Sequence, residues 1–64
     1  MSNADINLCF RVIDLEDVKY KGFKEDNKFC LAEQVWYSKS GMERMLAALL
    51  GQPVEKLAEI RKLI

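Results

Sequence analysis

The spacing of apolar side chains changes along this chain, and that change constrains the fold more than any other feature of the sequence. Between residues 5 and 38 apolar residues recur mainly at every second position, whereas from residue 42 onward they recur at every third or fourth position. A period of two is typical of a half-buried β-strand, and the wider spacing is typical of an amphipathic helix. The sequence therefore predicts strands followed by helices within one domain, residues 1–64.

Three segments carry the strand pattern: residues 5–13, 18–23 and 29–38. The first alternates cleanly, Gly22 weakens the second, and the third is apolar on both faces, as in a central or covered strand. The polar loop between the second and third segments contains Asn27, a residue type that tolerates a positive φ. These features predict an α+β fold with an antiparallel sheet of two or three strands.

Two helices are predicted in the last third of the chain, over about residues 41–50 and 53–63. Ser40 and Glu43 have the spacing of an S-x-x-E capping box, which starts a helix. Gly51 is placed to end that helix in a left-handed conformation, and Pro53 suits the first turn of the next helix, where its missing N–H is tolerated. We expect this C-terminal helical hairpin to pack on one face of the sheet.

The length of the chain limits the core that it can build. A folded chain of this size hides only about 60% of the surface that its unfolded form exposes. Such chains usually gain support from a disulfide, a metal or a second copy. Cys9 and Cys30 form no C-x-x-C pair, and the chain has no histidine to complete a zinc site. A disulfide between them would require neighbouring strands and an oxidising compartment. A homodimer is therefore the expected source of support.

The second predicted helix also favours a dimer. Its large apolar side chains spread over about half of its circumference, which is more than one sheet face covers. We expect the interface to include this helix and the tryptophan of the third strand. The expected interface residues are Trp36, Leu57, Ile60, Leu63 and Ile64. Met42 and Met45 either add an adaptable partner surface or fill the core.

The residue types present favour binding over catalysis. Without a histidine or a metal site, a general base would have to come from carboxylates, lysines or cysteines, and none of these is grouped in a catalytic spacing. The three glycines are isolated, so no phosphate-binding loop is present. We expect no enzyme activity, no catalytic residues and no cofactor. The function expected is that of a small binding or regulatory accessory protein, which acts through an apolar interface with a protein partner.

Nucleic-acid binding is the alternative. Lysines and aromatic rings interleave in residues 19–29, which could stack on the bases of a single strand. The candidate contacts are Lys19, Tyr20, Lys21, Phe23, Lys24 and Lys28. The C-terminal helices could instead form a helix-turn-helix that reads duplex DNA. A formal net charge of zero argues against both, because phosphate binding normally requires an excess of basic residues.

Targeting signals are the remaining sequence feature. No apolar run approaches the roughly 20 residues that cross a bilayer. The first residues are polar and acidic, unlike the basic start of a signal peptide. We therefore expect a cytoplasmic protein that does not contact a membrane. Small stand-alone domains of this kind also occur among bacteriophage and mobile-element products, although no residue here indicates such an origin.

Overall fold

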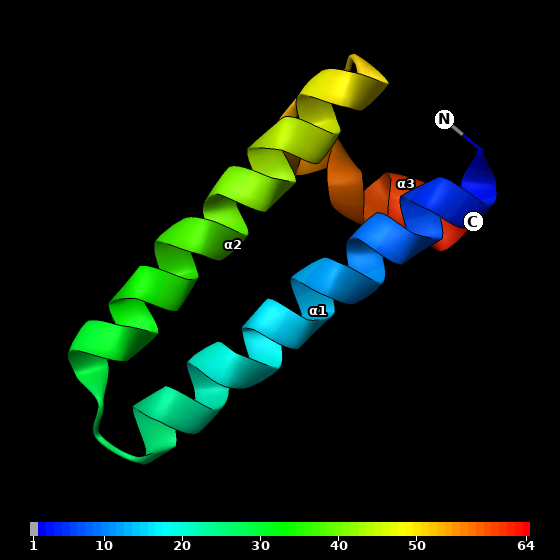
Figure 1. The fold of residues 1–64 in the computed structure, drawn as a ribbon. Coiled ribbons are helices and arrows are strands. Elements are labelled where there is room, and N and C mark those ends of the chain that lie inside the picture. Colours follow the sequence, from blue (N-terminus) through cyan, green and yellow to red (C-terminus); the bar gives the residue numbers. More distant parts are fainter. Residues whose placement is uncertain (1) are drawn as a thin grey trace.

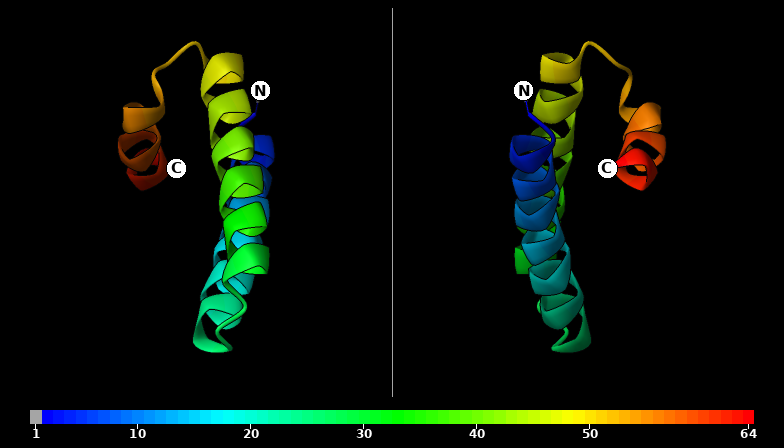
Figure 2. Two further views of the ribbon diagram at one scale, coloured as in Figure 1. Left: turned by 90° about the vertical axis from the view of Figure 1, so that its left-hand side faces the viewer. Right: turned by 90° about the vertical axis from the view of Figure 1, so that its right-hand side faces the viewer.

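The computed structural model describes residues 2–64, and these residues form a helical hairpin followed by a short third helix (Figure 1). The elements are α1 (Asn3–Glu25), α2 (Phe29–Leu50), the 3₁₀ turn η1 (Val54–Lys56) and α3 (Leu57–Leu63). α1 and α2 run antiparallel, and α3 returns to the first turns of α1, so that both termini lie at one end of the molecule. Seen edge-on, α3 covers only one face of the hairpin (Figure 2).

The predicted α+β fold with an antiparallel sheet is wrong, because the part of the chain that the structure describes contains no strand. Residues 5–13 and 18–23 both lie within α1. The alternation that suggested a strand arises because α1 carries two apolar stripes on different sides. Ile6, Phe10 and Ile13, spaced by four and three residues, form the buried stripe. The side chain of Ser2 caps the helix by accepting a hydrogen bond from the N–H of Asp5, at 3.2 Å.

The predicted third strand, residues 29–38, is also helical and forms the first half of α2. Apolar residues on both faces of this segment mark two stripes of a helix rather than a covered strand. The helix predicted over residues 41–50 is present, but it begins at Phe29. Ser40 and Glu43 therefore lie inside α2, and the predicted capping box does not start a helix there.

The predicted turn residues are confirmed where a positive φ was expected. Asn27 has a φ of 60° in the connection between α1 and α2, and Gly51 ends α2 with a φ of 65°. Pro53 immediately precedes η1, so the second predicted C-terminal helix begins about where its proline indicated. Its first turn is 3₁₀, which leaves α3 with only seven residues.

The main core lies at the end of the hairpin where the termini meet. Its buried members are Ile6, Phe10, Ile13, Leu46, Ala47 and Leu57. Only Leu57 comes from α3, and it fills the space between α1 and α2 on the face that α3 covers. Toward the interhelical turn, Ala32 is the one further buried apolar residue among those described. The chain is therefore well packed at one end and lightly packed at the other.

Candidate functional site

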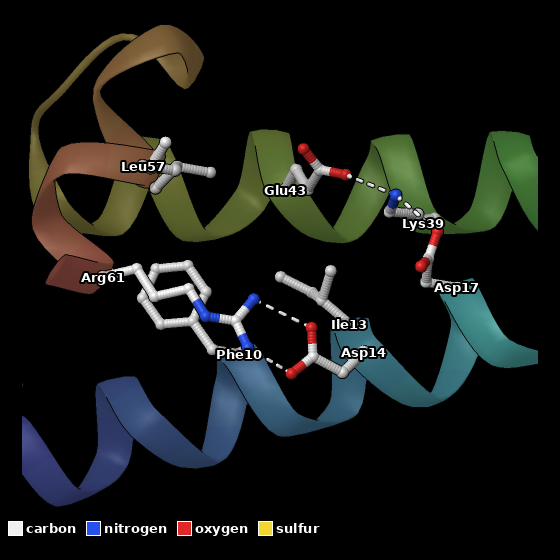
Figure 3. A pocket seen from close by; sticks show the side chains of 9 residues that line it. Phe10, Ile13, Asp14, Asp17, Lys39, Glu43, Leu57 and Arg61 are labelled. Atoms are coloured by element: carbon white, nitrogen blue, oxygen red, sulfur yellow. Dashed lines mark hydrogen bonds and ion pairs between the residues drawn. The ribbon is translucent and has the colours of Figure 1, made fainter.

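The first candidate is a charged pocket of about 300 Å³ between α3 and the hairpin (Figure 3). Arg61 of α3 forms a two-pronged ion pair with Asp14 of α1, with 2.8 Å between Nη1 and Oδ1. Its guanidinium also lies over the ring of Phe10, 5.3 Å from the centroid. On α2, the Nζ of Lys39 lies 3.1 Å from the Oδ1 of Asp17 and 3.9 Å from the Oε1 of Glu43. Every charge that lines this pocket is thus paired with another charge of the same chain.

These pairs hold the pocket's two aspartates in their ionised form. A hydrogen bond from Arg61 lowers the pKa of Asp14, and the same contact raises the pKa of Arg61. Hydrogen bonds from Lys21 and Lys39 lower the pKa of Asp17. A general acid at neutral pH needs a raised pKa, so these aspartates are poor proton donors. The pocket is better suited to fixing α3 on the hairpin than to catalysis.

The second candidate is an apolar groove on the face of the hairpin opposite α3, and we call it the lateral groove. Its volume is about 270 Å³. Its lining residues are Leu8, Cys9, Val12 and Ile13 of α1 and Met42, Met45, Leu46 and Leu49 of α2. Leu15 extends the α1 wall by one turn, because it follows Val12 at helical spacing. Leu8, Met45 and Leu49 are 60%, 69% and 65% exposed.

The third candidate is an aromatic cluster at the end of the hairpin that carries the interhelical turn, and we call it the aromatic tip. The rings of Tyr20 and Trp36 lie 5.4 Å apart at 48° to each other. Lys24 lies over the ring of Tyr20 and Lys39 over that of Trp36, at 5.6 and 5.5 Å from the centroids. The hydroxyl of Tyr37 donates a hydrogen bond to Glu33 at 3.5 Å. The tip is amphipathic, with rings, cations and carboxylates intermixed.

The structure separates the predicted interface residues. Leu57 is buried in the core of the single chain, and Ile60 and Ile64 pack partly against that core. Leu63 is 85% exposed and lies outside the lateral groove, while Trp36 is 48% exposed at the aromatic tip. The structure does not bring these five residues together on one exposed face.

The predicted nucleic-acid contacts spread around the last turns of α1 and the turn that follows. They are Lys19, Tyr20, Lys21, Phe23, Lys24 and Lys28. Lys19 pairs with Glu16 at 3.2 Å, and Lys21 pairs with Asp17 at 3.1 Å. Because a helix turns its side chains through about 100° per residue, these lysines do not form the single row that alternation on a strand would give.

The groove residues of α1 escaped the sequence prediction. The strand predicted over residues 5–13 would place Leu8 on the same face as Ile6 and Phe10, whereas the helix turns it away from them. The signal that identifies the groove is the spacing of Leu8, Val12 and Leu15 by four and three residues. Of the α2 wall, the prediction had singled out Met42 and Met45 as a possible partner surface.

The remaining predicted features concern thiols, metals and membranes. Cys9 and Cys30 are both free, the first half-buried in the lateral groove and the second exposed near the start of α2. Across residues 2–64, no group of three or more cysteines and carboxylates is arranged to hold a metal ion. None of the described helices combines the length and the apolar character that a membrane span requires. In comparisons with protein-family models, curated proteins and solved structures, no match to this chain was found.

Proposed function

We propose that this protein is a non-enzymatic binding or regulatory accessory protein that acts as a homodimer, with the lateral groove as its dimer interface. The observation that carries the proposal is the groove itself. Both of its walls are apolar, and three of its eight lining side chains, Leu8, Met45 and Leu49, are more than half exposed in the single chain. Exposed apolar patches of this kind, larger than single scattered residues, mark interaction surfaces.

The total exposed surface of the chain is consistent with an interface of standard size. The chain exposes 4860 Å². A compact monomer of its mass, 7.4 kDa, exposes about 4,200 Å². The excess is about 650 Å², close to the roughly 800 Å² that each partner contributes to a standard interface. A second copy that covers the groove would bring the exposed surface per chain near the value of an ordinary globular protein.

The choice of a binding role over catalysis rests on the charged pocket. Its two aspartates are held ionised and paired, and its cations are engaged by carboxylates of the same chain. Neither group is free to bind a substrate or to exchange a proton at neutral pH. Binding through an apolar surface is the activity that the remaining geometry favours.

Nucleic-acid binding remains a prediction, and we do not develop it as a second proposal. Around the aromatic tip, Lys24 and Lys28 are accompanied by Glu25, Asp26 and Glu33. The carboxylates there offset the lysines, so the field at the tip does not favour a phosphate backbone.

Sedimentation equilibrium at tens of micromolar tests the proposal. The wild-type chain should sediment with twice the mass of one chain. Leu49→Glu places a carboxylate in the groove, so we expect it to weaken association at least tenfold. Leu63→Glu is the matched control, because it puts the same charge on an exposed leucine outside the groove, and it should leave the dimer intact. A monomeric wild type, or equal effects of the two variants, would refute the proposal.

A further inference from the structure

A second stripe of apolar residues runs along the whole of α2. Its members are Leu31, Val35, Ser38, Met42, Met45 and Leu49, spaced alternately by four and three residues. This is the heptad spacing of a helix that packs along another helix. Only Ser38 among the six is polar. The inner stripe of α2, one residue further along, is already used against α1, as the burial of Ala32 and Leu46 indicates. Of the outer stripe, Met42, Met45 and Leu49 line the lateral groove, and the other three members continue along α2 toward the interhelical turn.

The register of the hairpin defines which α1 residues share this face. Asp17 is level with Lys39, and Tyr20 is level with Trp36, as their contacts indicate. In this register each residue of the outer stripe of α2 is level with one residue of α1, and we call such a pair a layer. In the layers near the termini both residues are apolar. Those layers pair Leu8 with Leu49, Val12 with Met45 and Leu15 with Met42. Toward the tip, the stripe's partners on α1 and its C-cap become Lys19, Gly22 and Asp26. The face is therefore apolar at one end and mixed at the other.

This asymmetry decides how two copies fit together. From it, and resting on the dimer proposed above, we infer that the second copy lies in the groove with its hairpin pointing in the same direction, forming a four-helix bundle. The two-fold axis then runs along the bundle, and the apolar layers of each copy meet the same layers of the other. Each α1 lies beside the partner's α2 and antiparallel to it, which is the usual arrangement in four-helix bundles.

The two opposed arrangements are less favourable for different reasons. If the copies overlap fully but point in opposite directions, Lys19 and Asp26 of one copy are placed over the apolar layers of the other, and burying charged groups there is costly. If they overlap only at their apolar ends, Leu31 and Val35 remain without a partner helix. Only the same-direction bundle covers the entire α2 stripe while keeping the mixed layers together at one end.

The arrangement has a consequence for the assembled protein. Both aromatic tips lie at the same end of the bundle, and the two α3 helices lie on its outer faces. The cluster built around Tyr20 and Trp36 is thereby doubled at one end.

The exposed thiol of Cys30, near the tip, provides the test. In Cys9→Ala protein, a nitroxide spin label on Cys30 allows the distance between the two copies to be measured by double electron–electron resonance. Helices in a bundle lie about 8–10 Å apart, so the same-direction bundle predicts a label distance within about 25 Å. With a rise of 1.5 Å per residue, both opposed arrangements separate the labels by about 30 Å or more.

The outcomes separate this inference from the proposed function. A dimer by sedimentation with a short label distance supports both. A dimer with a long distance overturns the same-direction arrangement and leaves the groove dimer in place. A monomer overturns both. Because Cys9 lines the groove, the Cys9→Ala protein is compared with wild type by sedimentation. If the substitution alone separates the copies, labels introduced at the exposed tip position by Lys28→Cys in Cys30→Ser protein that keeps the half-buried Cys9 provide the same comparison, and the same-direction bundle predicts a distance within about 25 Å.

Discussion

The two faces of the hairpin differ in their side chains and in what covers them. On one face, α3 folds back and Leu57 is buried between α1 and α2, to 5% exposure. On the other face, the stripe that contains Leu49 meets no further element of the described chain, and this leucine is 65% exposed. A hairpin of two helices cannot bury two stripes on each helix without additional helices. The chain provides one such helix for itself, and in the proposed dimer the other comes from the second copy.

The largest expected effect is a difference in the free energy of unfolding between substitutions on the two faces. Leu57→Ala should lower the free energy of unfolding of the single chain by about 2–4 kcal/mol, because it leaves a cavity in a small core. Leu49→Ala should change it by no more than about 0.5 kcal/mol, because the same side chain is mostly exposed there. Urea unfolding followed by circular dichroism, at a dilution where sedimentation reports monomers, measures both. Equal losses would show that the two faces do not differ as described.

A smaller effect concerns the ion pairs that fix α3. Arg61 lowers the pKa of Asp14 below its ordinary value of 3.8. The stabilisation from this carboxylate is therefore fully present above that value and is lost as the pH falls through the lower pKa of the folded state. Because the pair is largely exposed, its contribution is at most about 1 kcal/mol. Asp14→Asn should lower stability at pH 7 by that small amount, and its difference from wild type should shrink as the pH falls toward 2.

The matched control for this prediction is Glu25→Gln. Glu25 is exposed and has no cation within ion-pair distance among the described residues. Urea unfolding at pH 7 and pH 2 should therefore find less pH dependence in the Asp14→Asn protein than in the Glu25→Gln protein. The same pH dependence in both variants would argue that the Arg61 contact does not stabilise α3.

The comparison also explains what the sequence could and could not reveal. The positive φ of Asn27 and of Gly51 could be predicted from the sequence, because the conformation of each depends on its own residue type and its immediate neighbours. Helical structure after residue 41 could be predicted because the two apolar stripes of α2 adjoin there, so that apolar residues recur at every third or fourth position. The first 38 residues were misread because two stripes on one helix place apolar residues at alternate positions, as at Ile6 and Leu8.

The candidate interface was predicted less well than the helices. A prediction built on a sheet placed the excess apolar surface on the third strand, at Trp36, and on the terminal helix. The structure instead uses Leu57 internally and leaves Leu63 isolated. The chain still exposes apolar surface that its own fold does not bury. In the structure this surface lies on α1 and α2. The spacing of apolar residues alone could not locate this surface. Which face of the hairpin α3 covers depends on contacts between distant parts of the chain.

The most direct test of the central claim is an isotope-filtered NOE spectrum of a mixture of ¹³C-labelled and unlabelled chains. It detects only contacts between copies. If a second copy covers the lateral groove, methyl groups of Met45 and Leu49 should give NOEs to Leu8 and Val12 of the partner. Contacts between copies that arise only from Leu63 and other residues outside the groove, or no such contacts under dimer-forming conditions, would contradict the account.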